Sequence, residues 1–391
     1  MPARSSRPDT PALGIGMVGY AFMGLAHSRA WATVGQAFDV PLRPRMNVVV
    51  GRNEAATRFA ARRYGWHHVE TDWRALIDRD DVQLVDICTP GDTHAEIAIA
   101  ALDAGKHVLC EKPLANTLEE AEAMTVAAAR AAERGVRAMV GFNYRRVPAI
   151  ALAKRLIEQG RIGGLRHVRA AYLQDWLTDD GVPLTWRLQQ DRAGSGALGD
   201  IGAHAVDLAQ YLSGEHLTGV SGQLATFISE RPVAGGQAGE TGPVTVDDAA
   251  LFNGRLASGA LAAFEATRVA AGRKNALTIE VNGELGSLSF DLERLNELTF
   301  YDRTESELTA GFRRILVTEP SHPYLEGWWP PGHTLGWEHT FVHQARDLLS
   351  DIAADDDPAP SFADGLQVQR VLDAVASSAA HDSAWTKIQS P

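Results

Sequence analysis

The sequence predicts an α/β protein with two domains, a doubly wound parallel sheet followed by an α+β domain with a mostly antiparallel open sheet. The chain has 391 residues, which is more than one ordinary core accommodates. From residue 13 to residue 141, short apolar runs alternate with longer alanine-rich amphipathic segments. Beyond residue 144, strand-like runs follow one another with few helices between them. We therefore expect domains over residues 10–143 and 144–391.

In the first domain, each predicted strand is short and apolar on both faces, which is typical of a parallel sheet covered by helices on two sides. The predicted strands are Leu13–Val18, Asn47–Val50, Leu84–Ile87, His107–Leu109 and Val136–Val140. The helices between them are expected to start near Phe22, Glu54, Asp72, Thr93 and Thr117.

The second domain is expected to begin with a helix and to continue mainly as strands. Three of its strands are predicted at Arg166–Tyr172, Gly259–Ala266 and Ala276–Val281. Its predicted helices are Pro148–Gln159, Asp200–Leu212, Glu338–Leu349 and a last helix with Ser361 as its N-cap. A loop rich in tryptophan and proline, residues 321–335, precedes the third of these helices, and an acidic loop, residues 351–360, precedes the fourth.

Charge and composition narrow the function. With 45% apolar and 22% charged residues, the composition is typical of a soluble globular protein. The net charge of -12 argues against a nucleic-acid or membrane partner, whose phosphates would be repelled. The only two cysteines, Cys88 and Cys110, lie in apolar runs, so we expect buried thiols and a cytoplasmic protein. The uncharged stretch 12–26 is broken by glycines and is expected to belong to the fold rather than to a leader.

A glycine-rich turn after the first strand predicts a dinucleotide site in a Rossmann domain. Gly14, Gly16 and Gly19 fit the spacing GxGxxG, but no strand could precede them, so we reject that register. The next register, Gly19 to Gly24, follows the strand and opens a helix, with alanine in place of the middle glycine. A methyl group is the smallest intrusion towards a pyrophosphate. The expected cofactor contacts are Gly19, Ala21, Phe22, Met23 and Gly24.

The end of the second strand bears on the choice between NAD and NADP. A site that prefers NAD usually places an acidic residue there to hold the ribose 2′-hydroxyl. Here the strand ends in Gly51, Arg52 and Asn53, and the first carboxylate is Glu54. Arg52 could pair with a 2′-phosphate or stack on adenine, or it could be an ordinary surface arginine. The sequence leaves both cofactors open and leans towards NADP or dual use.

Four motifs together resemble one family of oxidoreductases. They are the glycine turn, the segment TPGDTH at 89–94, CEKPLA at 110–115 and GALGDIGAH at 196–204. Their order and spacing resemble the glucose–fructose oxidoreductase and inositol dehydrogenase family (Gfo/Idh/MocA), and the resemblance extends over essentially the whole chain. It implies that a nicotinamide cofactor exchanges a hydride with a secondary hydroxyl or ketone of a sugar, an anhydrosugar or an inositol.

Within that family, four further segments are most similar to an enzyme that oxidises C3 of the anhydrosugar levoglucosan. These segments are YLQDW at 172–176, PLTWR at 183–187, HPYLEG at 322–327 and PSFADG at 360–365. The resemblance therefore implies a levoglucosan-like substrate.

The resemblance maps the family's lysine, aspartate and histidine onto Lys112, Asp200 and His204 as catalytic residues. These residue types suit the oxidation of a secondary alcohol, which needs a hydride acceptor and a base. Asp200 and His204 are four residues apart and would share one helix face, and an imidazole ordinarily titrates near neutral pH. Lys112, held extended by Pro113, could donate to the reacting oxygen. Whether Lys112 or His204 takes the proton stays open.

Without the context of their motifs, these residues would be expected to have structural rather than catalytic roles. A lone Lys112 would be a surface charge, and His204 would be a hydrogen-bonded core histidine. Asp200 and His204 could also be two ligands of a metal, but no HExxH motif or cysteine cluster completes such a site, so no metal is expected.

The other candidates follow from the resemblance or from their position at the domain junction. The further cofactor candidates are Pro90, His94, Glu111, Lys112, Asn143, Trp186 and Arg187. The substrate candidates are Lys112, Tyr144, Gln174, Trp176, Asp200 and His204, together with Trp328 and Trp329 of the tryptophan-rich loop. Any of the less specific ones could instead pack at the hinge between the domains.

Two other functions stay open at this point. A keto-sugar reductase acting on a nucleotide- or antibiotic-linked sugar would use the same residues in reverse. A non-catalytic NAD(P)-binding sensor would need only the Rossmann domain. The presence of Lys112, Asp200 and His204 argues against the sensor, and the tryptophan-rich loop favours a small neutral sugar or cyclitol. We expect a homo-oligomer, either a dimer or a tetramer.

Overall fold

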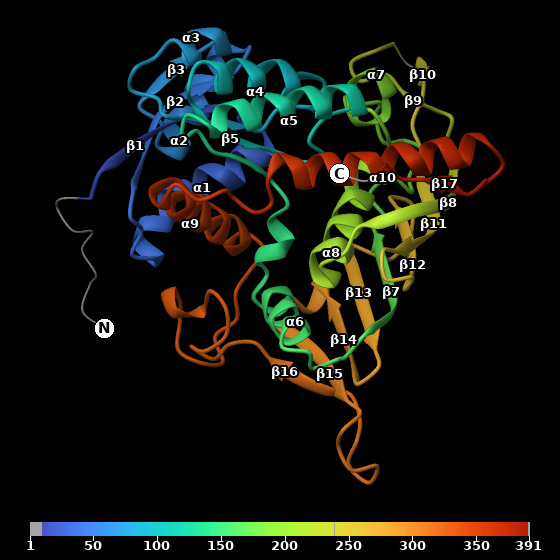
Figure 1. The fold of residues 1–391 in the computed structure, drawn as a ribbon. Helices are drawn as coiled ribbons and strands as arrows, with labels where there is room; N and C mark the ends of the chain where they lie inside the picture. Colours follow the sequence, from blue (N-terminus) through green and yellow to red (C-terminus); the bar gives the residue numbers. More distant parts are fainter. Residues whose placement is uncertain (1–9, 238, 390–391) are drawn as a thin grey trace.

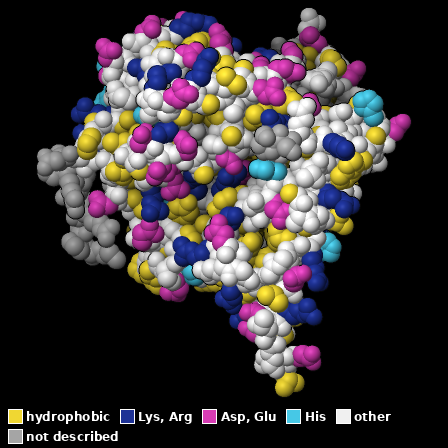
Figure 2. All heavy atoms as spheres, in the orientation of Figure 1, with side chains coloured by type: hydrophobic (Ala, Val, Ile, Leu, Met, Phe, Trp, Pro, Cys, Tyr) yellow, Lys and Arg dark blue, Asp and Glu magenta, His cyan; other side chains and the backbone are white. Residues whose placement is uncertain are grey.

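The computed structural model describes residues 10–237 and 239–389, which form two sheets packed against helices. Figure 1 shows the six-stranded sheet of the N-terminal half beside the larger sheet of the C-terminal half. On the face of the molecule in Figure 2, acidic and basic side chains are interspersed over both halves. No helix among the described residues is long and apolar enough to cross a membrane.

The first sheet is parallel throughout, with the strand order β3-β2-β1-β4-β5-β6. Its strands are β1 (Ala12–Val18), β2 (Arg43–Val50), β3 (His68–Glu70), β4 (Leu84–Ile87), β5 (His107–Cys110) and β6 (Ala138–Val140). Its helices are α1 (Phe22–Ala37), α2 (Glu54–Tyr64), α3 (Trp73–Ile77), α4 (His94–Asp103) and α5 (Leu118–Ala132). The doubly wound fold is confirmed, since apolar side chains of the strands join separate cores on the two faces of the sheet.

The local signals that placed the helices act as expected. The Asp72 side chain accepts from the backbone N–H of Arg74 at the start of α3. Thr117 and Glu120 form a reciprocal capping box at the start of α5. Within the first sheet, β3 is the strand that the sequence did not predict, because its three residues carry no apolar run.

The second sheet has nine strands in the order β16-β15-β14-β13-β7-β12-β11-β8-β17, and every pair except β7 with β12 is antiparallel. Its strands are β7 (Leu165–Leu173), β8 (Leu217–Ala225), β11 (Ala249–Leu256), β12 (Leu261–Thr267), β13 (Ala276–Gly283), β14 (Gly286–Asp291), β15 (Glu297–Asp302), β16 (Arg313–Leu316) and β17 (Thr386–Lys387). A separate ribbon is formed by β9 (Glu230–Pro232) and β10 (Thr241–Pro243). The mostly antiparallel second sheet is therefore confirmed.

Helices cover one face of this sheet and connect it to the first domain. The helices of this half are α6 (Pro148–Glu158), α7 (Gln190–Ala193), α8 (Ala203–Ser213), α9 (His339–Ala354) and α10 (Phe362–Ala380). The predicted helix Asp200–Leu212 is wrong at its start, because a π-helical turn, Leu198–Gly202, precedes α8. Helix α9 also runs further than the sequence indicated, through part of the acidic segment, because Ile352 still packs against the core.

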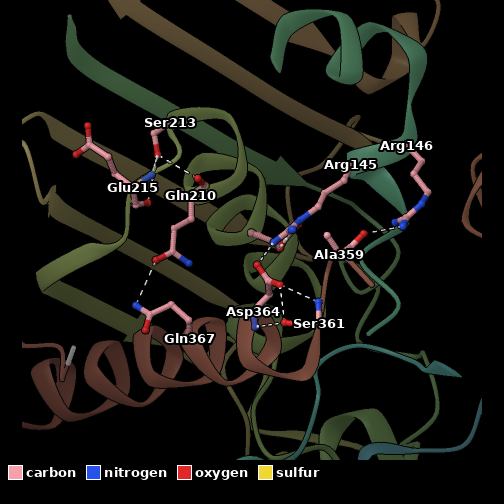
Figure 3. A network of polar contacts seen from close by, with 10 residues as sticks. Arg145, Arg146, Gln210, Ser213, Glu215, Ala359, Ser361, Asp364 and Gln367 are labelled. Atoms are coloured by element: carbon pink, nitrogen blue, oxygen red, sulfur yellow. Dashed lines mark hydrogen bonds and ion pairs between the residues drawn. The ribbon is translucent and has the colours of Figure 1, made fainter. Parts of the chain in front are cut away.

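The last two helices return to the Rossmann sheet, where α9 packs against α1 and α10 against α5. A polar network at this junction, part of which Figure 3 shows, includes Arg145, which pairs with Asp364 of α10 at 3.2 Å. Arg145 also pairs with Asp207 of α8 at 2.6 Å. The neighbouring Arg146 donates to the carbonyl of Ala359. These buried contacts hold the segment after β6 between the two halves of the molecule.

Candidate active site

A cavity of about 720 Å³ lies where the carboxyl ends of β1, β4 and β5 face the start of α8 and the strands β7 and β13. Ligands of doubly wound folds bind at this end of the strands. The residues of the sequence prediction that line it are Ala21, Phe22, Met23, Pro90, His94, Glu111, Lys112, Asn143, Tyr144, Gln174, Trp176, Trp186, Arg187, Asp200 and His204. Gly19, Gly24, Arg52, Trp328 and Trp329 lie outside this lining.

The glycine turn brings the first turn of α1 to the edge of the cavity. Gly19 has a φ of 101°, and a Cβ there would lie 2.7 Å from the carbonyl oxygen of Cys88. A Cβ on Gly24 would lie 2.3 Å from the carbonyl oxygen of Gly19. Both positions need glycine, which lets α1 start close to β4 with no side-chain cap on its N-terminal amides. Such an open helix N-terminus fits the pyrophosphate of a dinucleotide.

Arg52 stands at the end of β2, away from the lining of the cavity. Its side chain is exposed, and among residues 10–237 and 239–389 it forms no ion pair. Asn53 beside it caps α2 by accepting from the backbone N–H of Ala56. The role of Arg52 towards a cofactor stays a prediction.

Lys112 and Asp200 form a charged pair across the cavity. The Lys112 ammonium donates to the backbone carbonyl of Asp200 at 2.5 Å and lies 3.4 Å from its Oδ1. The Oδ2 of Asp200 lies 3.6 Å from the guanidinium of Arg268. Burial alone would raise the pKa of Asp200, but Lys112, Arg268 and Arg187 together hold it below its ordinary value. Asp200 is therefore an ionised carboxylate that orients Lys112.

His204 is a neutral imidazole in this site. It is buried against Tyr144, with ring centroids 4.5 Å apart, and its Nδ1 has no hydrogen-bond partner among the described residues. Burial, together with the positive charge of Lys112, holds the pKa of His204 well below its ordinary value. The expectation that His204 titrates near neutral pH is corrected here, because sequence spacing does not reveal how deeply an imidazole is buried.

The wall opposite the Rossmann domain carries a chain of hydrogen bonds. The hydroxyls of Tyr144 and Tyr172 lie 2.8 Å apart, and the Tyr172 hydroxyl donates to Oδ1 of Asn275 at 2.8 Å. The Gln174 amide also donates to Oδ1 of Asn275, at 2.7 Å, and the Trp176 indole donates to Oε1 of Gln174 at 2.9 Å. With these oxygens occupied, amide N–H groups remain as donors for the oxygen atoms of a polyol.

Sequence reasoning missed several lining residues, among them Tyr172, Arg268, Asn275 and Trp337. Tyr172 is the first residue of a motif that had been singled out, so a signal for it existed. Asn275 immediately precedes β13, whose pairing with β7 brings it beside Gln174. Trp337, just past the tryptophan-rich loop, stacks on Phe22 with ring centroids 5.4 Å apart. No local pattern marks Arg268 or Asn275, because strand pairing alone places them.

Two of the predicted residues, His94 and Trp328, have mainly structural contacts. Both ring nitrogens of His94 face backbone carbonyls, with Nε2 2.9 Å from Thr89 and Nδ1 3.1 Å from Pro113, so the side chain links the turn after β4 to the segment that carries Lys112. Trp328 donates to Nε2 of His343 at 2.7 Å, away from the cavity.

Matches to two family models cover most of the chain. Residues 13–142 match the model described as "Oxidoreductase family, NAD-binding Rossmann fold". Residues 150–289 match the "GFO/IDH/MocA C-terminal domain". The chain therefore belongs to the Gfo/Idh/MocA family of oxidoreductases and carries an NAD-binding Rossmann domain.

Individual relatives are similar to this chain over nearly its whole length. The chain is 45% identical over 388 residues to levoglucosan dehydrogenase of Pseudarthrobacter phenanthrenivorans, covering 96% of this chain and 98% of that enzyme. The crystal structure of an oxidoreductase domain protein from Kribbella flavida superposes with a TM-score of 0.95 at 63% identity, covering 97% of this chain and 100% of that one. A structure of levoglucosan dehydrogenase in complex with NADH and levoglucosan has a TM-score of 0.92 at 44% identity, with the same coverage.

Proposed function

We propose that this oxidoreductase removes a hydride from a secondary hydroxyl of a small neutral sugar, at C3 of levoglucosan or of a similar anhydrosugar. The observation that carries the proposal is the meeting of Lys112, Asp200 and His204 in one cavity with the glycine turn of the NAD-binding domain. The similarity to levoglucosan dehydrogenase over nearly the full chain supports the substrate class. An inositol would present an equivalent secondary hydroxyl.

The roles of the three residues follow from their charges. A bound nicotinamide ring would supply the hydride acceptor. The neutral ring of His204 accepts the proton of the substrate hydroxyl. The Lys112 ammonium donates a hydrogen bond to the same oxygen as negative charge develops on it, and Asp200 holds that ammonium in place. On this assignment His204, rather than Lys112, is the base.

The residues of the opposite wall would bind the rest of the sugar. The amides of Gln174 and Asn275 have N–H groups for hydroxyl or ether oxygens, and the face of Trp176 suits the C–H side of a sugar ring. A keto-sugar reductase remains the alternative, since the same groups serve the reverse reaction. Its nucleotide-linked substrate would need cations for a diphosphate, and of the two arginines that line the cavity, Arg187 and Arg268, the second is already engaged with Asp200 and the backbone of Asp247.

We also propose that NADP is accepted beside NAD, because Arg52 occupies the position where a carboxylate would exclude a 2′-phosphate. The solved complexes of levoglucosan dehydrogenase with NADH support NAD as a cofactor of this fold.

For the assembly, we propose a homo-oligomer formed through the open face of the second sheet, where a groove includes Leu251, Asn253 and Glu265. A cytoplasmic location agrees with the thiols of Cys88 and Cys110, which are free and buried. Burial raises the pKa of both thiols.

The test is a screen of levoglucosan, inositols and aldoses, with NAD and NADP separately, that follows the absorbance of the reduced cofactor. Levoglucosan with NAD is expected to give the highest kcat/KM. Reduced cofactor formed only with inositols would redirect the proposal to a cyclitol. No turnover with any substrate, despite measurable NADH binding, would contradict it and favour the sensor.

A further inference from the structure

Three buried polar side chains beneath the cofactor end of the cavity have no place in the proposed reaction. Nδ1 of His27, in α1, lies 2.9 Å from Oδ1 of Asp86, in β4. Nε2 of the same ring lies 2.9 Å from Oε1 of Glu111, which follows β5. His27 is 2% exposed, Asp86 0% and Glu111 5%. We call His27, Asp86 and Glu111 the carboxylate–imidazole cluster.

Every neighbouring polar contact supplies a further donor to this cluster. The Trp31 indole donates to Oδ2 of Asp86 at 2.7 Å, and the backbone N–H of Lys112 lies 3.3 Å from Oε2 of Glu111. The Cys88 thiol lies 3.5 Å from Oδ1 of Asp86. His27, Asp86 and Cys88 are close enough to hold a metal ion, but both ring nitrogens already face carboxylates. The contacts therefore describe a satisfied hydrogen-bond cluster.

The net charge of the cluster follows from counting protons. Each of the two contacts between the imidazole and a carboxylate contains one proton, on nitrogen or on oxygen. An imidazolium between two carboxylates sums to one negative charge. A neutral imidazole between one carboxylate and one carboxylic acid gives the same sum. Burial, the largest single influence, lowers the pKa of His27, but the charge and hydrogen bond of Asp86 together with those of Cys88 raise that pKa well above the ordinary value, in favour of the first arrangement.

We propose that this buried negative charge makes the protein bind NAD⁺ in preference to NADH. Glu111 lines the cavity beside Lys112, at the end of the strands where the nicotinamide half of the cofactor belongs. The oxidised nicotinamide ring is positively charged and the reduced ring is neutral, so a fixed negative charge below it stabilises only the oxidised form. Buried charges are weakly screened, and the preference therefore persists at high salt.

The consequence for catalysis is release of the reduced cofactor. After an alcohol is oxidised, the ring has lost its charge and with it the attraction of the cluster. NADH then dissociates more readily than it would from a neutral site. This inference concerns the cofactor alone, so it holds whichever sugar proves to be the substrate and is independent of the substrate screen.

The test compares the Kd of NAD⁺ and of NADH, measured on the full chain without sugar by calorimetry and by NADH fluorescence. The double variant Asp86→Asn/Glu111→Gln keeps the shape of the cluster but leaves a neutral imidazole between two amides. It should weaken NAD⁺ by roughly 10- to 100-fold and change NADH little, as expected for one unit charge about 6 to 12 Å away in an effective dielectric of about 20. The matched control, Glu122→Gln/Glu133→Gln, removes two exposed carboxylates near α5 and should leave both constants unchanged.

Equal weakening of NAD⁺ and NADH in a folded double variant would overturn the proposal, because a purely structural cluster affects both forms alike. An unchanged ratio would overturn it as well. If the double variant does not fold, His27→Gln tests the opposite change, an increase in the negative charge of the cluster. It removes the positive partner and leaves two carboxylates, so NAD⁺ should gain on NADH as the pH is raised. A preference for NAD⁺ below that of the parent protein at alkaline pH would reject the proposal, because the two remaining carboxylates then carry at least the single negative charge of the parent cluster.

Discussion

The two sides of the cavity hold their polar groups in different ways. On the cofactor side, His27, Asp86 and Glu111 are buried and saturate one another with hydrogen bonds. On the substrate side, Gln174 and Asn275 are only partly buried and keep N–H groups free of partners among the described residues. A fixed charge suits a nicotinamide ring whose own charge changes with its oxidation state, whereas spare donors suit a sugar that must be recognised by its oxygens.

This difference predicts that changes on the two sides separate cofactor affinity from sugar turnover. The largest effect is expected from substitution of Lys112, whose side chain reaches across the cavity to Asp200. Lys112→Ala should lower kcat by roughly 10²-fold or more, because the developing alkoxide loses its donor, while the Kd of NADH stays within a few fold. Steady-state kinetics and NADH fluorescence measure the two quantities. Lys274→Ala, at an exposed lysine, is the control. Loss of NADH binding in Lys112→Ala would show that the lysine maintains the cofactor site.

Asp200→Asn should have a smaller effect, a decrease in kcat of about tenfold. The Lys112 ammonium keeps its hydrogen bond to the backbone carbonyl of residue 200, so it is held less firmly but is not released. Asp175→Asn, outside the cavity, supplies the control in the same assay. A complete loss of turnover would mean that Asp200 itself handles a proton.

On the substrate wall, Asn275→Ala should raise the KM for the sugar by about tenfold at most, the cost of one or two hydrogen bonds. The hydrogen bonds from Tyr172 and Gln174 both end on this amide, so the wall also loses its fixed geometry. The Kd of NADH should not change, and Gln237→Ala, at an exposed amide outside the cavity, should change neither value. A shift in NADH affinity would break the division between the two sides.

The smallest expected effect lies at the far end of the cofactor. Arg52→Asp should change the ratio of kcat/KM for NADP to that for NAD by severalfold in favour of NAD, because the side chain would repel a 2′-phosphate. Arg45→Asp, at an exposed position in β2, makes the same change in net charge and should leave this ratio unchanged. Equal losses with both cofactors would remove Arg52 from cofactor selection.

The sequence predicted those features that local chemistry determines. Thr117 and Ser361 act as N-caps, and the glycine turn starts α1, because hydrogen bonding and steric contact within a few residues decide them. Lys112, Asp200 and His204 were candidates through motifs, and the fold brings them to one cavity.

Features that depend on contacts between distant segments could not be predicted from the sequence. Asn275 reaches the site through the pairing of β13 with β7, and Trp337 reaches it by stacking on a ring more than 300 residues away in the chain. The lowered pKa of His204 depends on burial by both halves of the molecule. The π-helical turn at Asp200 has no local signal that separates it from an α-helix.

The most direct test of the proposed chemistry is the kcat/KM for levoglucosan of the parent protein divided by that of His204→Ala, measured from about pH 6 to pH 9. An imidazole accepts a proton only above its own pKa, and burial beside Lys112 holds that pKa well below the ordinary value. His204 is therefore neutral over this whole range, so the ratio should be roughly 10²-fold or more and independent of pH. A ratio near one would make Lys112 the base, and a ratio that falls away at the acidic end would show that His204 titrates in the ordinary range and contradict the site as described.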